Sequence, residues 1–470
     1  MSTTDPTSLT TLLEMQRSSF LRDGPPSFAQ RREHLDLLVK SIQSHREKLV
    51  ESISGDFGHR SRQETWCLEL MPIVQGIRHL QRHLKKWMRP ERRRVELTFM
   101  PGSNRVIYQP LGVIWIISPW NYPAALALMP LATALAAGNR AMLKPSELTP
   151  ATSALMSSML SKCFDPDRVA VVAGDASVAT EFSSLPFDHL LFTGSTAVGR
   201  KVMRSASDNL VPVTLELGGK SPAIVGRGSS LEQAAHRIAW GKLANAGQTC
   251  IAPDYVLVAD DEIEDFIGHY LSEVGNLYPE IATNPDYTTI INDHHYQRLA
   301  GLLDDARAKG AQIREVGAPV TRRTHPRTFL PAVITGLTDE MTVAKEEIFG
   351  PILPIVPYRT IEDAIVYINA RPRPLALYHF GSNNHDRSQL LERTTSGGVA
   401  LDDTLLHYAQ DDLPFGGVGA SGMGAYHGHE GFKTLSHAKG VFSQANINGM
   451  DLIRPPFGKW FELAMKWLLR

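Results

Sequence analysis

Apolar positions recur with two different spacings along the chain, and the first of them is typical of helices. Up to about residue 100 they recur at three- and four-residue intervals, behind a Ser27–Gln30 pair with the spacing of a capping box. The recurring positions are Leu35, Leu38, Val39, Ile42, Leu49 and Ile53. This pattern predicts a helix that Gly55 ends, and a second helical stretch over 69–88.

Beyond residue 106 short apolar runs alternate with helical segments. Strands are predicted over 113–117, 141–143, 169–173, 190–193, 213–217, 223–225, 255–258 and 354–356. Helices are predicted over 124–137 (closed by Gly138), 150–163, 197–206, 262–276 and 298–309. Near-continuous apolar strands that alternate with helices indicate an α/β fold with a parallel, doubly wound sheet. Such sheets bind ligands at the carboxyl ends of their strands.

The length and the charge add limits to this picture. The chain has 470 residues, with 48 Lys and Arg against 49 Asp and Glu, and this length predicts about two to four domains. A near-neutral chain has no general attraction for nucleic acid or for an anionic membrane. The basic run over 82–94 contains seven Lys or Arg and one Glu. We interpret it as a solvated helix face or a subunit contact, and expect no nucleic-acid partner.

No segment of the sequence has the pattern of a signal peptide or of a membrane span. The most apolar stretch, 113–137, is interrupted by Ser118, Asn121 and three prolines. We interpret the apolar segment 460–469 as a docked terminal helix, with a membrane contact as the alternative. Three scattered cysteines form neither a disulfide framework nor a metal-binding pair, so we expect a cytoplasmic protein.

One of the three cysteines has a context that suits a nucleophile. Cys250 ends the segment NAGQTC, where small residues would let backbone N–H groups and a substrate approach the thiol. A buried structural cysteine is the alternative for Cys250. Cys67 and Cys163 lie in helical patterns without such a context, and we assign them to packing.

Two polar residues stand where a catalytic site would need them. Glu216 ends an apolar strand before Gly-Gly, where partial burial would raise its pKa toward that of a general base. An exposed edge carboxylate is the alternative. Asn121 lies in the turn WNYP between a strand and a helix, where its amide could either stabilise an oxyanion or cap the helix.

Several segments have the composition of ligand-binding turns. Lys144 and Glu147 in KPSE, and Gly194 and Ser195 in FTGS, follow strands and precede helices, where ribose and phosphate groups bind. Ordinary loops and caps are the alternative for both. The segment 417–422 satisfies GxGxxG, but it follows no strand and we reject it as a dinucleotide fingerprint. His427 and His429 lack a third ligand at sensible spacing, so no metal site is predicted.

Seven motifs occur in one order: WNYP, KPSE, FTGS, LELGGK, GQTC, EEIFGP and PFGG. With them the chain resembles the aldehyde dehydrogenase superfamily from about residue 28 to 436. The segments NAGQTCIAPDY, RPRPLALY and LPFGGVGASGMGAYHG are similar to the class 3 branch. Within that branch, DFGHRS and RHLKKWMRPERR most resemble bacterial coniferyl aldehyde dehydrogenases.

The resemblance implies a Rossmann-type cofactor domain, an α/β catalytic domain and a small β oligomerisation element. The corresponding boundaries are 1–91 with 111–218 for the cofactor domain, 219–412 for the catalytic domain, and 92–110 with 425–445 for the oligomerisation element. It also implies a homodimer. Asp402 departs from the Asn expected in relatives, which leaves the contacts of its loop open.

The resemblance also implies roles for matching residues. Cys250 would be the nucleophile and Glu216 the general base, with the Asn121 side chain and the Cys250 N–H as oxyanion donors. The implied cofactor is NAD or NADP. Its ligands would be Lys144 and Glu147 at the adenosine ribose, Gly194 and Ser195 at the pyrophosphate, Glu347 at the nicotinamide ribose and Phe349 beside the ring. Glu147 would repel a 2′-phosphate, which favours NAD.

The implied reaction is oxidation of an aldehyde to the acid, with an aromatic or phenylpropenyl substrate such as coniferyl aldehyde. Tyr122 and Trp240 could line an aromatic pocket, but packing in the core is the favoured interpretation of both. The alternatives are a class 3-type enzyme for medium- or long-chain aliphatic aldehydes, a CoA-acylating dehydrogenase, a cysteine hydrolase, and a non-catalytic binding protein. The sequence names no His partner for a hydrolase. It also lacks a long apolar C-terminal anchor, which argues against a membrane-bound fatty-aldehyde enzyme.

Overall fold

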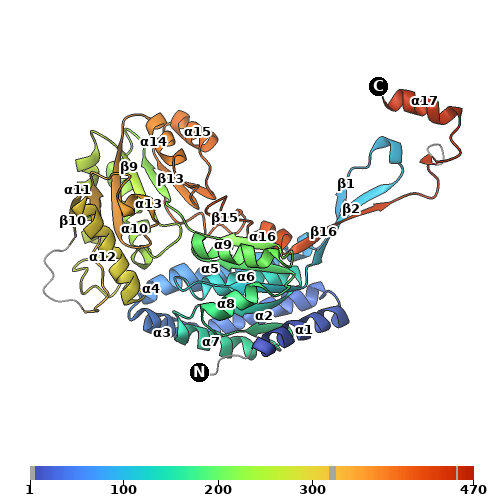
Figure 1. Ribbon diagram of the computed structural model, residues 1–470, viewed down its shortest axis with the longest axis horizontal. Helices are drawn as coiled ribbons and strands as arrows, with labels where there is room; N and C mark the ends of the chain where they lie inside the picture. The colour runs from blue at the N-terminus through green and yellow to red at the C-terminus, as the bar shows by residue number, and fades with distance from the viewer. Residues whose placement is uncertain (1–5, 317–323, 451–453, 470) are drawn as a thin grey trace.

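The computed structural model describes residues 6–316, 324–450 and 454–469, and its first large sheet has six strands (Figure 1). Their order across the sheet is β15-β7-β6-β3-β4-β5. The strands are β3 (Val113–Ile117), β4 (Arg140–Lys144), β5 (Val169–Val171), β6 (His189–Thr193), β7 (Val213–Glu216) and β15 (Gly422–Met423). All neighbours are parallel except β15, which runs antiparallel to β7.

Helices cover both faces of this sheet because its strands are apolar on both sides. Along β3, Trp115 packs into the core shared with α1, α8 and α9, whereas Ile114 and Ile116 pack into the larger core around α6. The helices of this half are α1 (Pro6–Asp23), α2 (Phe28–Ser44), α3 (Arg46–Phe57), α4 (Arg62–Thr65), the π-helix η1 (Trp66–Leu70), α5 (Met71–Trp87), α6 (Ala125–Ala137), α7 (Pro150–Ser161), α8 (Ala176–Ser183), α9 (Thr196–Ser207) and α16 (Gly428–Thr434). Every residue of α6 is buried, because α2, α5 and α16 cover the side that faces away from β3 and β4.

The second sheet has seven strands in the order β10-β11-β12-β9-β8-β13-β14, all parallel except β10. Its strands are β8 (Pro222–Val225), β9 (Tyr255–Ala259), β10 (Gln312–Glu315), β11 (Ala332–Thr335), β12 (Ile352–Tyr358), β13 (Ala376–Phe380) and β14 (Gly398–Leu401). Its helices are α10 (Leu231–Leu243), the short 3₁₀ turn η3 (Ala244–Gly247), α11 (Ile263–Leu277), α12 (Asp293–Ala308), α13 (Thr342–Lys345), α14 (Ile361–Asn369) and α15 (Asn384–Arg393).

A third, antiparallel sheet projects from the body, with α17 (Lys459–Leu468) beyond it (Figure 1). It consists of β1 (Glu91–Arg93), β2 (Ser103–Pro110) and β16 (Ser436–Ser443), with the 3₁₀ turn η2 (Leu97–Phe99) between the first two. No residue of α17 is buried, and Trp460 and Trp467 are 72% and 68% exposed. The prediction that this terminal helix docks is therefore wrong, since the described part of the chain buries none of its residues. Among the described helices, none combines the length and the apolarity that crossing a membrane requires.

The α/β class and the parallel, doubly wound sheet predicted from the sequence are confirmed. One prediction about the first hundred residues is wrong. His45 separates α2 from α3, and α3 continues past Gly55 to Phe57, because the left-handed C-cap conformation falls on Gly58 (φ 83°). The helical stretch predicted over 69–88 is confirmed: the π-helix η1 ends at Leu70, and α5 continues from Met71 to Trp87 with Pro72 in its first turn.

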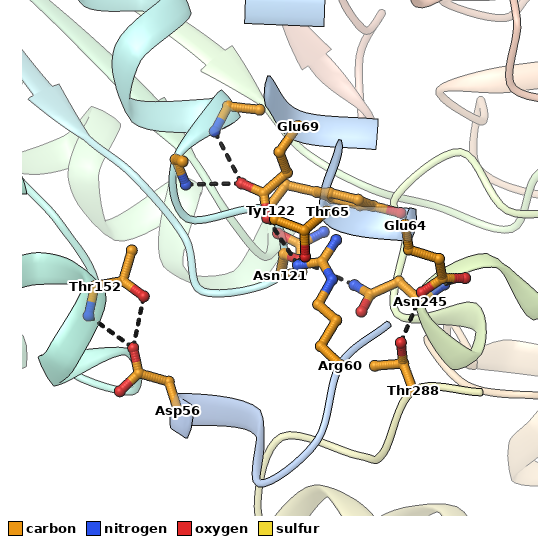
Figure 2. A network of polar contacts seen from close by, with 12 residues as sticks. Asp56, Arg60, Glu64, Thr65, Glu69, Asn121, Tyr122, Thr152, Asn245 and Thr288 are labelled. Atoms are coloured by element: carbon orange, nitrogen blue, oxygen red, sulfur yellow. Dashed lines mark hydrogen bonds and ion pairs between the residues drawn. The ribbon is translucent and has the colours of Figure 1, made fainter. Parts of the chain in front are cut away.

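One capping interaction in this half joins two helices that are far apart in sequence. Asp56 of α3 accepts hydrogen bonds from the backbone N–H of Ala151 (2.9 Å) and Thr152 (2.8 Å), and from the Thr152 hydroxyl (2.7 Å). Figure 2 shows the two bonds from Thr152. These N–H groups belong to the first turn of α7, whose own N-cap residue, Thr149, makes no side-chain cap bond. A carboxylate from α3 therefore satisfies the exposed donors of α7.

We predict that Asp56→Ala lowers the free energy of unfolding by about 1 kcal/mol, because the first turn of α7 loses its acceptor. Denaturant titration monitored by fluorescence measures the loss. Asp56→Asn keeps an acceptor oxygen and serves as the matched control, with a smaller expected loss. Equal stability of the Ala variant and the unsubstituted protein would contradict the role of Asp56 as a cap.

Candidate active site

The carboxyl ends of four neighbouring strands carry most of the predicted site. Glu216 ends β7, Thr193 ends β6 before Gly194, and the register pairs these two ends directly. The turn with Asn121 follows β3, and Lys144 ends β4, paired with Ile117 of β3. The sheet therefore brings the candidate base, the candidate oxyanion donor and both ligand-binding turns to one edge, as expected for a parallel sheet.

The candidate nucleophile comes from the other large sheet. Cys250 precedes β9, and Glu347 and Phe349 precede β12, its parallel neighbour. These residues lie in loops at the amino ends of their strands and face the carboxyl edge of the six-stranded sheet across a cavity of about 480 Å³. The cavity is lined by Pro119, Trp120, Asn121, Leu126, Thr193, Gly194, Ser195, Thr196, Ala197, Glu216, Leu217, Gly218, Cys250, His295, Arg298, Glu346, Glu347 and Phe349.

Cys250 follows a backbone turn that few residues adopt. Asn245, Ala246 and Gly247 all have left-handed φ angles of 54°, 51° and 75°. A Cβ on Gly247 would lie 2.4 Å from the carbonyl oxygen of Gly350, so the turn needs glycine at this position. Non-glycine residues in this conformation store strain that the surrounding structure must offset, which is typical of functional sites.

The electrostatic environment of the thiol disfavours its ionised form. Burial, with smaller contributions from the nearby Glu347 and Glu216 carboxyls, raises the pKa of the Cys250 thiol to about 12. Hydrogen bonds from the backbone N–H groups of Cys250 and Ile251 oppose this rise in pKa. In this environment the thiol needs an additional positive charge to become a thiolate at neutral pH.

Glu216 is buried in the wall of the cavity. The residue is 2% exposed, and neither carboxyl oxygen has a hydrogen-bonding partner among the described residues. Burial raises its pKa well above that of an exposed carboxyl. The alternative of an exposed edge carboxylate is therefore wrong. The glycine-rich segment 417–422 lies beside it, since Gly422 of β15 pairs with Glu216, and it leads from β14 of the seven-stranded sheet to β15 of the six-stranded one.

Asn121 is held by the loop that carries the cysteine. Its Nδ2 donates a hydrogen bond of 3.1 Å to the carbonyl of Gln248, two residues before Cys250. The alternative that Asn121 caps α6 is wrong, because Glu69 accepts the hydrogen bonds of the first α6 N–H groups. Asn121 and Cys250 both line the cavity.

Glu347 and Phe349 form the opposite wall. Burial raises the pKa of Glu347 to about 8, and the carboxyl of Asp254 contributes to this rise. A Cβ on Gly218 would lie 2.3 Å from the Glu347 carboxyl oxygens, so a larger residue at position 218 would displace this carboxyl. Phe349 adopts a left-handed φ of 50° and meets the Trp120 ring edge to face, with 5.4 Å between ring centroids.

Comparison with known proteins decides the family. A family model described as "Aldehyde dehydrogenase family" matches residues 24–441. The chain belongs to the aldehyde dehydrogenase family.

Individual relatives agree with this assignment. A "Probable coniferyl aldehyde dehydrogenase" of Pseudomonas aeruginosa is 52% identical, over 98% of this chain and 96% of its own length. The "Coniferyl aldehyde dehydrogenase" of Pseudomonas sp. strain HR199 is 46% identical, over 97% and 95%. The solved structure titled "Substrate bound state of Staphylococcus Aureus AldH" superposes with a TM-score of 0.92 at 35% identity, over 98% of this chain and 99% of that one. The resemblance read from the sequence motifs is confirmed, and the chain is an aldehyde dehydrogenase.

Two of the predicted cofactor residues do not line the cavity of this enzyme. Lys144 and Glu147 lie at the end of β4, where the Lys144 ammonium forms an ion pair of 3.0 Å with the Glu147 carboxylate. Lys144 is buried, whereas the Glu147 side chain is 45% exposed. The pair therefore lies farther along the same sheet edge, beyond the end of β3.

Several residues that line the cavity of the enzyme have no predicted role, and three of them carry aromatic or titratable side chains. Trp120 lies in WNYP, which assigns it no role, and His295 and Arg298 of α12 belong to no recognised motif. Burial, aided by Arg298 and His294, lowers the pKa of His295 to about 4, so its imidazole is neutral at pH 7. The two residues considered for an aromatic pocket lie elsewhere: the Tyr122 hydroxyl bonds to Thr249 Oγ1 (2.6 Å), and Trp240 packs against the core.

Two further sequence features have structural explanations in the enzyme. Asp402 forms an ion pair with Arg387 and accepts a hydrogen bond from the Gly381 N–H (3.0 Å), so this carboxylate ties its loop to α15. His427 packs among aromatic rings, 5.0 Å from Phe415 between centroids. Within the described ranges, no three His, Cys, Asp or Glu side chains are grouped so that they could hold a metal ion.

We predict that alkylation of Cys250 by iodoacetamide in the cofactor-free enzyme accelerates about tenfold per pH unit from pH 7 to 10, without a plateau. The thiolate appears only as the pH approaches a pKa raised to about 12. Mass spectrometry measures the rate, with Cys250→Ala giving the background from other thiols. Glu347→Gln removes one negative charge and should raise the rate at pH 8. A plateau near the pKa of an ordinary cysteine, ~8.5, would contradict this prediction.

Proposed function

We propose that the enzyme oxidises an aromatic or phenylpropenyl aldehyde, such as coniferyl aldehyde, to its carboxylic acid with NAD(P)+, through a thiohemiacetal and a thioester on Cys250. The observation that carries the chemistry is a single cavity lined by the Cys250 thiol, the Glu216 carboxyl and the Asn121 amide. The names of two relatives support the substrate class. The Trp120 and Phe349 rings in the same cavity wall are consistent with an aromatic substrate.

The residues of this chain fit a nicotinamide dinucleotide. Gly194 and Ser195 stand at the N-terminus of α9, which opens on the cavity and has no acidic residue in its first turn. Thr193 Oγ1 is buried beside them and has no hydrogen-bonding partner among the described residues. The Glu347 carboxyl is placed to accept hydrogen bonds from ribose hydroxyls. When bound, the oxidised nicotinamide accepts the hydride and brings a positive charge near the thiol.

Lys144 and Glu147 fit the far end of that ligand. Both residues lie at the carboxyl end of β4, the strand next to β3. Their ion pair keeps a donor and an acceptor together for ribose hydroxyls. We propose NAD as the preferred cofactor, because the Glu147 carboxylate would repel a 2′-phosphate at that position.

In the acylation half of the proposed reaction, the Cys250 thiolate adds to the aldehyde carbonyl and a C–S bond forms. The carbonyl electron pair moves onto oxygen, where Asn121 Nδ2 and the Cys250 N–H stabilise the negative charge. The C=O bond then re-forms as the hydride leaves, and Cys250 carries a thioester. An aldehyde gains a hydride-donating C–O⁻ group only after such an addition, which is why the reaction needs a nucleophile.

In the deacylation half, Glu216 takes a proton from a water molecule whose oxygen attacks the thioester carbon. The C–S bond breaks, the carboxylic acid is released, and the proton on Glu216 returns to the Cys250 sulfur. Burial raises the pKa of Glu216, which makes its carboxylate a stronger base, and its oxygens have no other hydrogen-bonding partner among the described residues. A catalytic base that activates water favours hydrolysis over transfer to CoA.

We predict that the enzyme reduces NAD+ with coniferyl aldehyde, and that Cys250→Ala loses this activity by at least about 10³-fold while NAD+ still binds. Absorbance of the reduced nicotinamide, measured with an aromatic and a long-chain aliphatic aldehyde and with NAD+ and NADP+, gives the comparison. A higher kcat/KM with the aliphatic aldehyde would assign the enzyme to that class instead. Full turnover by Cys250→Ala would refute the covalent mechanism.

We predict that Glu216→Gln retains a single-turnover burst of reduced cofactor but loses steady-state turnover about 10²-fold or more, because the thioester is no longer hydrolysed. Rapid-mixing kinetics separate the two phases. Thioester trapped on Cys250 is expected in the intact mass of the variant. Unchanged steady-state turnover of the variant would contradict the base role. Faster turnover of the unsubstituted enzyme when CoA is added would indicate an acyl-CoA product.

We also propose the domain arrangement that the resemblance implies. Residues 1–91 and 111–218 would bind the cofactor, 219–412 would carry the catalytic cysteine, and 92–110 with 425–445 would form a homodimer contact. The projecting sheet supports the last point, since it exposes Leu97, Phe99 and Phe442, and a measured mass of one chain in solution would contradict it. A cytoplasmic location would keep the Cys250 thiol reduced.

A further inference from the structure

A buried arginine lies directly behind the turn that carries Asn121. Arg60 follows α3, and its side chain is fully buried. Its Nη1 donates hydrogen bonds both to Glu69 Oε1 (2.8 Å) and to the backbone carbonyl of Asn121 (3.0 Å), as Figure 2 shows. The guanidinium also lies over the Tyr122 ring, 4.8 Å from its centroid. One nitrogen of Arg60 thus joins an ion pair to the backbone of the proposed oxyanion donor.

The partner of Arg60 holds the other end of the same turn. Glu69 Oε2 accepts hydrogen bonds from the N–H groups of Ala124 (2.8 Å) and Ala125 (3.0 Å), at the start of α6. Glu69 lies in the π-helix η1, a wide turn that is often found at functional sites. Because α6 makes no side-chain cap bond of its own at Ala124, Glu69 is the group that fixes where this helix begins.

The loop of the nucleophile meets the same carbonyl. Asn245 Nδ2 donates to the carbonyl oxygen of Asn121 (2.9 Å) and to that of Gln248 (3.1 Å). Asn121 Nδ2 donates to the Gln248 carbonyl as well. Both lone pairs of the Asn121 carbonyl are therefore used, one by Arg60 and one by the loop that leads to Cys250.

We propose that Arg60 is a positioning residue for the oxyanion site: through the Asn121 carbonyl and through Glu69 it fixes the turn between β3 and α6, and so the direction of the Asn121 side-chain amide. This inference rests on the proposed role of Asn121. It assigns Arg60 no contact with the substrate, the cofactor or the reacting atoms.

Energetics favour this role over a purely stabilising one. A buried ion pair costs desolvation that its attraction often fails to offset, and well-packed apolar residues usually serve stability as well. Arg60 Nε and Nη2, moreover, have no hydrogen-bonding partner among the described residues. The side chain is therefore satisfied only at the nitrogen that faces Glu69 and Asn121. A residue selected for stability alone would leave fewer buried donors without a partner.

The chain offers a matched control. Arg140 is likewise buried, forms ion pairs with Asp23 (2.6 Å) and Asp167 (3.2 Å), and has an Nε without a partner among the described residues. It begins β4, at the sheet edge opposite the candidate site. Arg140→Met therefore reports what the loss of a buried, ion-paired arginine does to the enzyme when no site residue is touched.

The test is a double-mutant cycle on the rate of the single-turnover burst with NAD+ and coniferyl aldehyde. Asn121→Ala is expected to slow the burst about 10²-fold, as loss of an oxyanion donor does. Arg60→Met is expected to slow it about tenfold or more in the unsubstituted background, but less than about twofold in the Asn121→Ala background. The KM for NAD+ stays within about twofold, and Arg60→Lys, which keeps one charged donor, recovers most of the rate.

The results distinguish the role of Asn121 from that of Arg60. If Asn121→Ala leaves the burst unchanged, the proposed oxyanion role is wrong and the role of Arg60 is wrong with it. Suppose that Asn121→Ala slows the burst. The role of Arg60 alone is then overturned if Arg60→Met slows the burst by the same factor with and without Asn121→Ala. It is also overturned if Arg60→Met slows the burst no more than Arg140→Met does. Should Arg60→Met fail to fold, the pair Arg60→Met with Glu69→Gln, which removes both charges of the ion pair, enters the same cycle.

Discussion

The site depends on one constraint: polar groups taken from two different sheets have to be buried against each other without losing their hydrogen bonds. The carboxyl edge of the six-stranded sheet meets the loops before β9 and β12, so the cavity wall is made of turns whose backbone groups no helix or strand satisfies. Side chains from outside the turns supply the partners. Gln248 shows this well, since its side-chain amide reaches the carbonyls of Asn245 and Thr289 and accepts from the Ile291 N–H.

The same burial sets the chemistry of the cavity. Glu216, Glu347 and Cys250 all have raised pKa values, mainly because each loses water, and the two carboxyls also disfavour the thiolate. The nearby cation Lys220 is already engaged by Asp254 (2.9 Å) and by two backbone carbonyls. Arg298, which lines the cavity, likewise donates to the carbonyls of Glu347 and Ile348. A ligand that brings its own positive charge, as an oxidised nicotinamide does, would lower the pKa values of the buried thiol and carboxyls.

The sequence predicts the parts of this site that follow from local patterns. Apolar runs predict the strands, parallel strands align their carboxyl ends, and the residues after those ends then meet, as Glu216 and Gly194 do. Local patterns do not predict contacts that depend on packing between distant segments. Nothing local relates Arg60 to Asn121, although the segment DFGHRS contains it, and the exposed face of α17 has the same apolar pattern as a docked helix. Gly55 and Gly58 are equally good helix ends in sequence, and only the backbone φ distinguishes them.

The hydrogen bond from Asn121 to Gln248 looks at first like a loss for catalysis, because it occupies a donor of the proposed oxyanion site. A side-chain amide has two N–H donors on one nitrogen, however, and Asn121 Nδ2 uses one of them for the Gln248 carbonyl. That bond prevents the amide from turning its oxygen toward the cavity, where it would repel an oxyanion. The remaining N–H is then fixed in direction before substrate arrives, and no reorganisation is needed when charge develops on the carbonyl oxygen.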